Sequence, residues 1–257
     1  MKGVQIFVHS VAIVLRNLVP ALRISGLIYF IMMAVQLWFF NSYGNVLASD
    51  ITGNGDVGVM VPPPGFFSSY LLMLVVSIVG GLWIAVAWHR YVLEEEISGG
   101  PIPYWRGAQI GRYFGRSILL GLIIGVPITM VLSIVMGMAA MSANVVVPTA
   151  IGVVVLFFGV YLFYRLCSIL PAAALNRPLT MGESWRATEG AGGPIVVLVI
   201  IALVGAAILQ LPGLVFGGNE TFLGLIWTVI SGWLTLMISA STLTTFYGHY
   251  IEGRELM

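Results

Sequence analysis

Three histidines, His9, His89 and His249, have the most versatile chemistry in this sequence. An imidazole can bind a metal ion or carry a proton near neutral pH, so a site that gathered all three could do either. No HExxH or comparable spacing pairs two of them on one helix face. The sequence therefore favours a simpler role, in which each histidine caps a helix end or faces lipid headgroups.

Three consecutive carboxylates, Glu94, Glu95 and Glu96, follow His89 and Arg90 closely. Such a cluster could take part in acid–base catalysis or bind a divalent cation. Adjacent side chains on a helix point in different directions, however, and glycines and prolines end the segment soon afterwards. We therefore expect these carboxylates to lie in a solvated loop.

A second acidic stretch, from Asp50 to Asp56, contains glycines and an asparagine between its two aspartates. Calcium loops combine acidic and amide oxygens with flexible glycines in a similar way. This stretch lacks the regularly spaced ligands and the closing glutamate of an EF-hand. A flexible turn followed by the stiff segment Pro62-Pro63-Pro64 is the favoured interpretation.

Motifs of known enzyme classes are absent from the sequence. It contains no GxSxG, no phosphate-binding loop, no kinase motifs and no dinucleotide fingerprint, and Ser184 has no base nearby in the chain. The single cysteine, Cys167, excludes internal disulfides and metal sites built from paired cysteines. We predict a protein without catalytic activity, metal or cofactor. An intramembrane enzyme acting on lipid would need His89, His249 and Glu94–Glu96 to converge.

The composition is that of a protein surrounded by lipid. Of 257 residues, 59% are hydrophobic and only 8% are charged, compared with roughly 25% charged residues in ordinary soluble domains. The eleven basic and ten acidic residues nearly cancel, leaving a net charge of +1, so no excess of charge favours nucleic acid as a partner.

Six stretches have the roughly 20 apolar residues that a helix needs to cross a bilayer, which predicts an all-α membrane protein forming a single integral domain, 1–257. The predicted spans are Ala21–Phe40, Phe66–Trp88, Ser117–Met141, Val146–Ser168, Pro194–Phe216 and Phe222–Tyr247.

The basic residues predict the orientation of these spans, because arginine and lysine near span ends are retained in the cytoplasm during insertion. All eleven fall on one side of the six-span arrangement, and the other side has Asp50, Asp56 and Glu220. We therefore expect a protein of a bacterial cytoplasmic (inner) membrane with both termini in the cytoplasm.

A repeat of about 80 residues is also expected, in which each unit has an interfacial cytoplasmic segment and then a hairpin of two spans. The units lie near residues 1–95, 100–170 and 178–251 and form three hairpins. Thr180 and Glu183 have the spacing of a capping box at a helix start in the third unit.

The first interfacial segment has an amphipathic pattern. Polar residues from Lys2 to Arg23 recur near multiples of 3.6, which places them on one narrow stripe. We expect the segment to lie among the headgroups until Pro20 bends the chain toward the first span. Its apolar face comprises Val4, Phe7, Val8, Val11, Leu15, Leu18 and Leu22.

Arginines and tryptophans at the predicted cytoplasmic interface are the candidate site residues. Each arginine there can attract anionic lipid by about 1 kcal/mol, or can serve only to set the topology. The arginines are Arg16, Arg23, Arg106, Arg112, Arg116, Arg177 and Arg186. The tryptophans Trp88, Trp105 and Trp185 are predicted to anchor helices at the membrane surface.

Small residues and prolines suggest how the spans pack. Gly121 and Gly125 form a GxxxG motif, and Gly80-Gly81 offers another small surface for close helix packing. A transporter with a site between hairpins, near Pro127 and Pro171, is the alternative function. It would require a water-filled cavity lined by polar side chains at mid-depth.

The segment from Arg165 to Gly190, RLCSILPAAALNRPLTMGESWRATEG, resembles one found in bacterial six-span proteins. These include the membrane domain beside glycerophosphodiester phosphodiesterases and YciC-like proteins. The resemblance implies interfacial helices between hairpins and transfers no catalytic residue. With the basic face, it favours an accessory, scaffold or lipid-interacting protein, whose partners are membrane lipids and either another membrane protein or a second copy.

Overall fold

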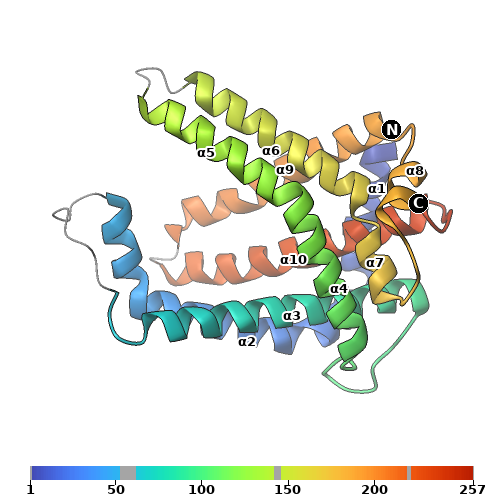
Figure 1. Cartoon of the computed structure of the whole chain (residues 1–257). Coiled ribbons are helices and arrows are strands. Elements are labelled where there is room, and N and C mark those ends of the chain that lie inside the picture. The colour runs from blue at the N-terminus through green and yellow to red at the C-terminus, as the bar shows by residue number, and fades with distance from the viewer. Residues whose placement is uncertain (1, 53–61, 142–145, 219–220, 257) are drawn as a thin grey trace.

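The computed structural model describes residues 2–52, 62–141, 146–218 and 221–256, and in these residues it contains helices and turns but no strand (Figure 1). Six helices are long and apolar enough to cross a membrane. The predicted all-α, six-span fold is therefore confirmed, and the chain is a multi-pass membrane protein. Glu220 and the part of the acidic stretch from residue 53 to Asp56 lie outside the described residues.

Ten α-helices follow one another in the part of the chain that the structure describes. They are α1 (Lys2–Arg16), α2 (Leu18–Thr52), α3 (Phe66–Glu94), α4 (Gly107–Leu120), α5 (Val126–Met141), α6 (Val146–Leu166), α7 (Ile169–Ala174), α8 (Met181–Ala187), α9 (Gly192–Val215) and α10 (Phe222–Tyr250). A π-helical turn, Gly121–Gly125, joins α4 to α5 without a break. The expected interfacial segment before the third span is thus continuous with that span.

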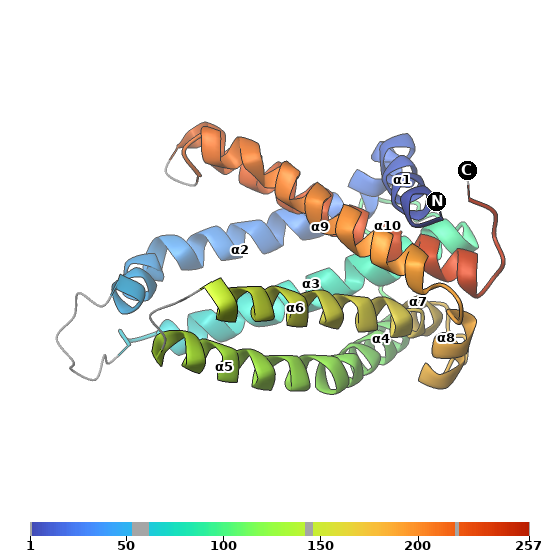
Figure 2. The ribbon, with the colours of Figure 1, turned by 90° about the horizontal axis from the view of Figure 1, so that it is seen from above.

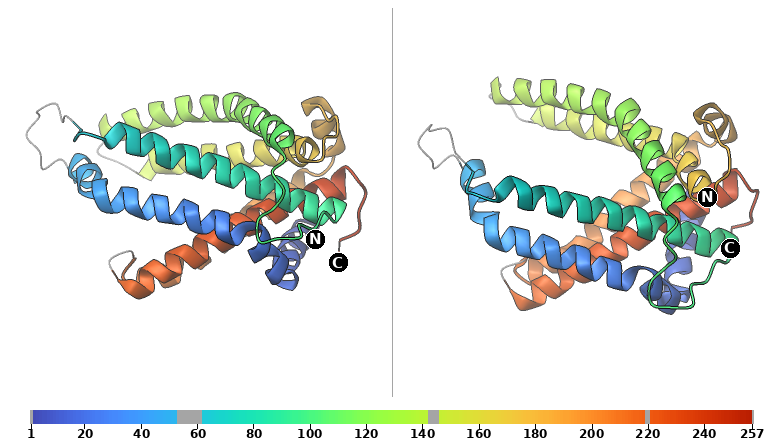
Figure 3. Two further views of the ribbon diagram at one scale, coloured as in Figure 1. Left: turned by 90° about the horizontal axis from the view of Figure 1, so that it is seen from below. Right: turned by 60° about the horizontal axis from the view of Figure 1, so that its bottom comes forward.

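Consecutive long helices pack along each other in pairs: α2 against α3, α5 against α6, and α9 against α10 (Figure 2). Both chain termini lie at the same end of the molecule as α7 and α8. The end of α5 and the beginning of α6 lie at the opposite end (Figure 3). The three-unit repeat stays a prediction. The predicted units also contact one another: α1, from the first unit, packs against α9 and α10, from the third.

The fully buried residues of α1 are not those of the predicted apolar face. Gly3, Ile6, Ser10 and Val14 are buried, whereas Val8, on the predicted apolar face, is 57% exposed. A Cβ at Gly3 would lie 2.3 Å from the carbonyl oxygen of Pro194, so the two backbones touch here. The helix is interrupted at Asn17 rather than at Pro20, where we expected the bend, and α2 begins two residues before Pro20.

The core at the terminal end of the bundle contains a tryptophan that we expected at the membrane surface. Trp88 is 0% exposed, and its indole N–H donates to the hydroxyl of Ser241 at 2.9 Å. The prediction that Trp88 anchors the helix at the interface is therefore wrong. Trp105 and Trp185 remain about half exposed, with Trp105 packed edge-on against Trp83.

The GxxxG motif does not mediate close helix packing. A Cβ added at Gly121 or Gly125 would meet no neighbour within 4 Å, and both residues bracket the π-helical turn instead. Gly80 does allow close approach, because a Cβ there would lie 2.5 Å from the sulfur of Met32. The first glycine pair therefore marks irregular helix, and of the second pair Gly80 alone marks a helix contact, because a Cβ at Gly81 would meet no neighbour within 4 Å.

Candidate functional site

A basic cavity opens between α4 and the chain that follows α7. Its volume is about 490 Å³, and three of the seven predicted arginines line it together. The lining consists of Arg112, Gly115, Arg116, Leu119, Ile169, Ala173, Asn176, Arg177, Pro178 and Leu179. We call this cavity the basic pocket.

Two of the pocket's arginines come from one face of α4. Arg112 and Arg116 are four residues apart, and such residues are neighbours on a helix surface. An adjoining face of α4 holds the buried residues Ile110, Tyr113 and Leu120. Burial of that apolar face determines the rotation of α4 and so directs the two arginines away from the core.

A buried polar cluster reinforces the position of α4. The phenolic oxygen of Tyr113 lies 3.3 Å from Nε2 of His89, and Nδ1 of His89 lies 2.7 Å from Oγ1 of Thr244. His89 is 0% exposed, so it neither faces headgroups nor caps an exposed helix end. It links α3, α4 and α10 instead.

The three histidines therefore do not form one site. His249 lies near the chain end, where its Nδ1 is 3.1 Å from the carbonyl oxygen of Arg254. His9 belongs to α1, and burial together with the charge of Arg16 lowers its pKa. Within the described residues, no group of three His, Cys, Asp or Glu side chains could hold a metal ion.

The third pocket arginine is placed by the end of α7. Asn176 adopts a left-handed conformation with φ 58°, which asparagine tolerates better than most residues. The amide of Arg177 then donates to the carbonyl oxygen of Ala172 at 2.8 Å and closes the helix end. Pro178 cannot continue a helix, so the sequence Asn-Arg-Pro turns the chain at the pocket.

The charges around the pocket are unevenly balanced. Arg177 pairs with Glu252 of the C-terminal segment, whereas neither Arg112 nor Arg116 has a carboxylate partner among the residues described. Burial lowers the pKa of Arg177, but the charge of Glu252 and a hydrogen bond with Tyr247 outweigh it and raise the pKa overall. The pocket therefore has an excess of positive charge.

No family model, curated protein or solved structure matches this chain. The resemblance of the segment from Arg165 to Gly190 thus stays a prediction.

The remaining predicted arginines lie elsewhere. Arg16 ends α1, Arg23 lies in α2, and Nε of Arg186 donates to the carbonyl oxygen of Gly182 within α8. Arg106 pairs with Glu96. The structure therefore brings together three of the seven predicted arginines, and these share one cavity.

An arginine that we did not single out has a structural role. Arg165 is 7% exposed and donates to the carbonyl oxygens of Thr188, at 2.6 Å, and Trp185. Its guanidinium also lies 4.0 Å from the ring centre of Trp185. Its positive charge faces the negative end of the α8 dipole. Arg165 lies at the end of α6, 20 and 23 residues before Trp185 and Thr188, so no local pattern in the sequence reveals this contact.

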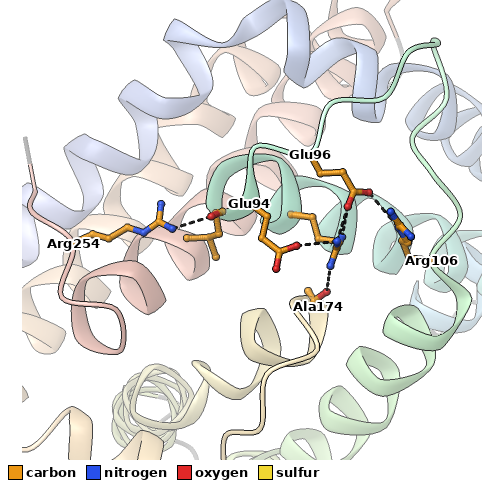
Figure 4. A network of polar contacts seen from close by, with 7 residues as sticks. Glu94, Glu96, Arg106, Ala174 and Arg254 are labelled. Atoms are coloured by element: carbon orange, nitrogen blue, oxygen red, sulfur yellow. Dashed lines mark hydrogen bonds and ion pairs between the residues drawn. The ribbon is translucent and has the colours of Figure 1, made fainter.

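Two of the three consecutive glutamates belong to an ion-pair network (Figure 4). Arg90 contacts Glu94 at 2.8 Å and Glu96 at 2.5 Å, and Glu96 also accepts from Arg106 at 3.2 Å. Arg90 further donates to the carbonyl oxygen of Ala174 at 3.3 Å, which ties α3 to α7. Glu94 therefore belongs to α3, whereas Glu96 lies in the expected loop but is held there by two arginines.

Stability should depend on the ionisation of Glu96. Burial raises its pKa, but hydrogen bonds from Arg90 and Arg106 outweigh burial and bring the pKa below its ordinary value of 4.5. A lowered pKa means that the ion pairs stabilise the fold above pH 4.5 and stop doing so as the pH falls further. We expect Glu96→Gln to cost about 1 to 2 kcal/mol at pH 7 and progressively less below pH 4.5.

Unfolding of both proteins in mixed detergent micelles at pH 7 and at several acidic pH values measures this difference. Glu95→Gln is the matched control, because Glu95 lies outside the network and ends α3 with φ 55°. A difference between Glu96→Gln and the unsubstituted protein that stays constant down to the lowest pH would contradict the ion-pair explanation.

The intramembrane surface offers a cavity of another kind. A space of about 510 Å³ lies between α2 and α10 and is lined by apolar and aromatic side chains, among them Phe30, Met33, Leu37 and Trp233. A transport site for a polar solute would need convergent polar groups at this depth. The lining of this cavity suits lipid chains better.

Proposed function

We propose that this chain is a non-catalytic protein of a bacterial cytoplasmic membrane, with both termini in the cytoplasm, that binds an anionic lipid headgroup in the basic pocket. The proposed orientation is supported by the placement of all eleven basic residues near one set of span ends. Its role would be that of an accessory or scaffold protein whose partners are membrane lipids.

The observation that carries this proposal is the excess of guanidinium groups at a single cavity. Arg112 and Arg116 lie side by side without carboxylate partners in the described part of the chain, and Arg177 lines the same cavity from the other side. Guanidinium groups form paired hydrogen bonds with phosphate oxygens, so the adjacent Arg112 and Arg116 can hold one phosphate between them.

The apolar part of the lining favours a lipid over a soluble anion. Leu119, Ile169 and Leu179 line the pocket beside the arginines, and Leu119 lies in a helix that crosses the membrane. A phospholipid could therefore place its phosphate on the arginines and its glycerol and upper acyl carbons against these side chains.

Loss of both unpaired arginines should weaken lipid binding strongly. We expect Arg112→Gln/Arg116→Gln to retain about 10- to 100-fold less phosphatidylglycerol, since each arginine near the membrane surface attracts anionic lipid by about 1 kcal/mol. The protein would be reconstituted in phosphatidylcholine nanodiscs with a small fraction of phosphatidylglycerol, and bound lipid counted by native mass spectrometry.

The control is the double variant Arg23→Gln/Arg186→Gln, which removes the same charge from exposed sites outside the pocket. Equal lipid loss in the two double variants would refute the pocket and indicate general surface attraction. Displacement of the lipid by millimolar inorganic phosphate would show that the pocket binds the soluble anion, and would overturn the assignment to lipid.

A further inference from the structure

The C-terminal segment places a carboxylate against one arginine of the basic pocket. One oxygen of Glu252 accepts a hydrogen bond from Nη1 of Arg177, and the other accepts from Nε of Arg254 at 2.7 Å. The side chain of Glu252 is only 13% exposed, whereas that of Arg177 is 45% exposed. A negative charge from the chain itself therefore neutralises one of the three arginines that line the pocket.

The fold holds this carboxylate in place after α10 ends. Gly253 adopts a left-handed conformation with φ 70°, which lets the amide of Arg254 donate to the carbonyl oxygen of Gly248 at 2.8 Å. The guanidinium of Arg254 also donates to the carbonyl oxygen of Leu93 at 2.9 Å (Figure 4). These bonds secure Arg254 to α3 and α10, and Arg254 in turn holds Glu252.

Because two arginines share Glu252, the carboxylate can give up one of them without losing all its charge compensation. If a ligand took Arg177, Glu252 would keep its contact with Arg254. Exchange at Arg177 is then a substitution of one anion for another. The incoming anion must offer Arg177 more negative charge than the carboxylate does.

On the basis of the proposed function, we infer that the basic pocket selects lipids with a phosphate monoester headgroup, such as phosphatidate, and that Arg177 is the residue that determines this specificity. A phosphodiester carries a single charge, which Arg112 and Arg116 can neutralise while Arg177 stays with Glu252. A monoester carries a charge of about −1.5 to −2 near neutral pH and three terminal oxygens. Its additional charge can displace Glu252 from Arg177.

The test compares phosphatidate with phosphatidylglycerol at equal mole fraction in phosphatidylcholine nanodiscs, using the full chain. We expect the unsubstituted protein to retain about 10-fold more phosphatidate, which corresponds to one additional charged hydrogen bond. Arg177→Gln should remove this preference, so that phosphatidate and phosphatidylglycerol are then retained to within about twofold of each other, because both can still bind the Arg112–Arg116 pair.

Glu252→Gln tests the competing carboxylate directly. Once the negative charge of Glu252 no longer competes for Arg177, we expect phosphatidate retention to rise by about three- to tenfold. Glu255→Gln is the matched control, since it makes the same charge change in the same exposed segment and lies outside the basic pocket. It should leave retention unchanged.

An unchanged preference in Arg177→Gln, or an equal rise in Glu252→Gln and Glu255→Gln, would overturn this inference. If Arg112→Gln/Arg116→Gln still lost lipid in that case, headgroup binding would stand without the monoester specificity. If that double variant also kept its lipid, the proposed function would fail together with the inference.

Discussion

Trp88→Ala is expected to lower the free energy of unfolding by about 3 to 5 kcal/mol, the range for removing a large buried aromatic side chain. The indole is wholly buried in a cluster with Val14, Ile84 and Met237. Its loss would open a cavity between α1, α3 and α10, and would leave the hydroxyl of Ser241 without its indole donor. Unfolding in mixed detergent micelles measures the difference.

Trp105→Ala provides the comparison, because Trp105 is 56% exposed and packs only one side of its ring against Trp83. We expect a loss of less than about 1 kcal/mol, as for most exposed positions. Similar losses for Trp88→Ala and Trp105→Ala would mean that Trp88 does not belong to a packed core.

Gly3→Val is the second substitution with a large expected effect. A Cβ at Gly3 would lie 2.3 Å from the carbonyl oxygen of Pro194 and 2.9 Å from the amide nitrogen of Leu198. Both atoms belong to the backbone of α9, so a rotamer change cannot relieve the clash. We expect α1 to be pushed away from α9, at a cost of about 3 kcal/mol in stability.

Two measurements check this expectation. Micelle unfolding reports the loss of stability, and hydrogen exchange should rise in residues 2–16 before it rises elsewhere. Gly26→Val is the control, because a Cβ at Gly26 has no neighbour within 4 Å, and its cost should stay below about 1 kcal/mol. Unchanged exchange in α1 of Gly3→Val would contradict the close backbone contact.

The basic pocket could be predicted only in part. Charge placement identified Arg112, Arg116 and Arg177 as interfacial arginines, but the same reasoning selected Arg23 and Arg186, which lie outside the pocket. Which arginines share a cavity depends on how α4 packs beside α7. Glu252 was missed because it lies 75 residues from Arg177 in the chain, and no local pattern relates the two.

The sequence alone determined the features that depend on a few neighbouring residues or on transfer into lipid. Runs of about 20 apolar residues determine which helices can cross a membrane. The Thr180–Glu183 capping box, which the structure confirms, depends on hydrogen bonds within a single helix turn. Each of these features is decided without reference to a distant part of the chain.

Only the tertiary structure decided which side of each helix meets protein. Trp88 is buried and Val8 is exposed, although both are apolar residues near a predicted interface. In water, burial separates apolar from polar side chains, so periodicity reveals the buried face. In a membrane, lipid chains and the protein interior are equally apolar, and backbone fit at Gly3 or a hydrogen bond at Trp88 decides the contact instead.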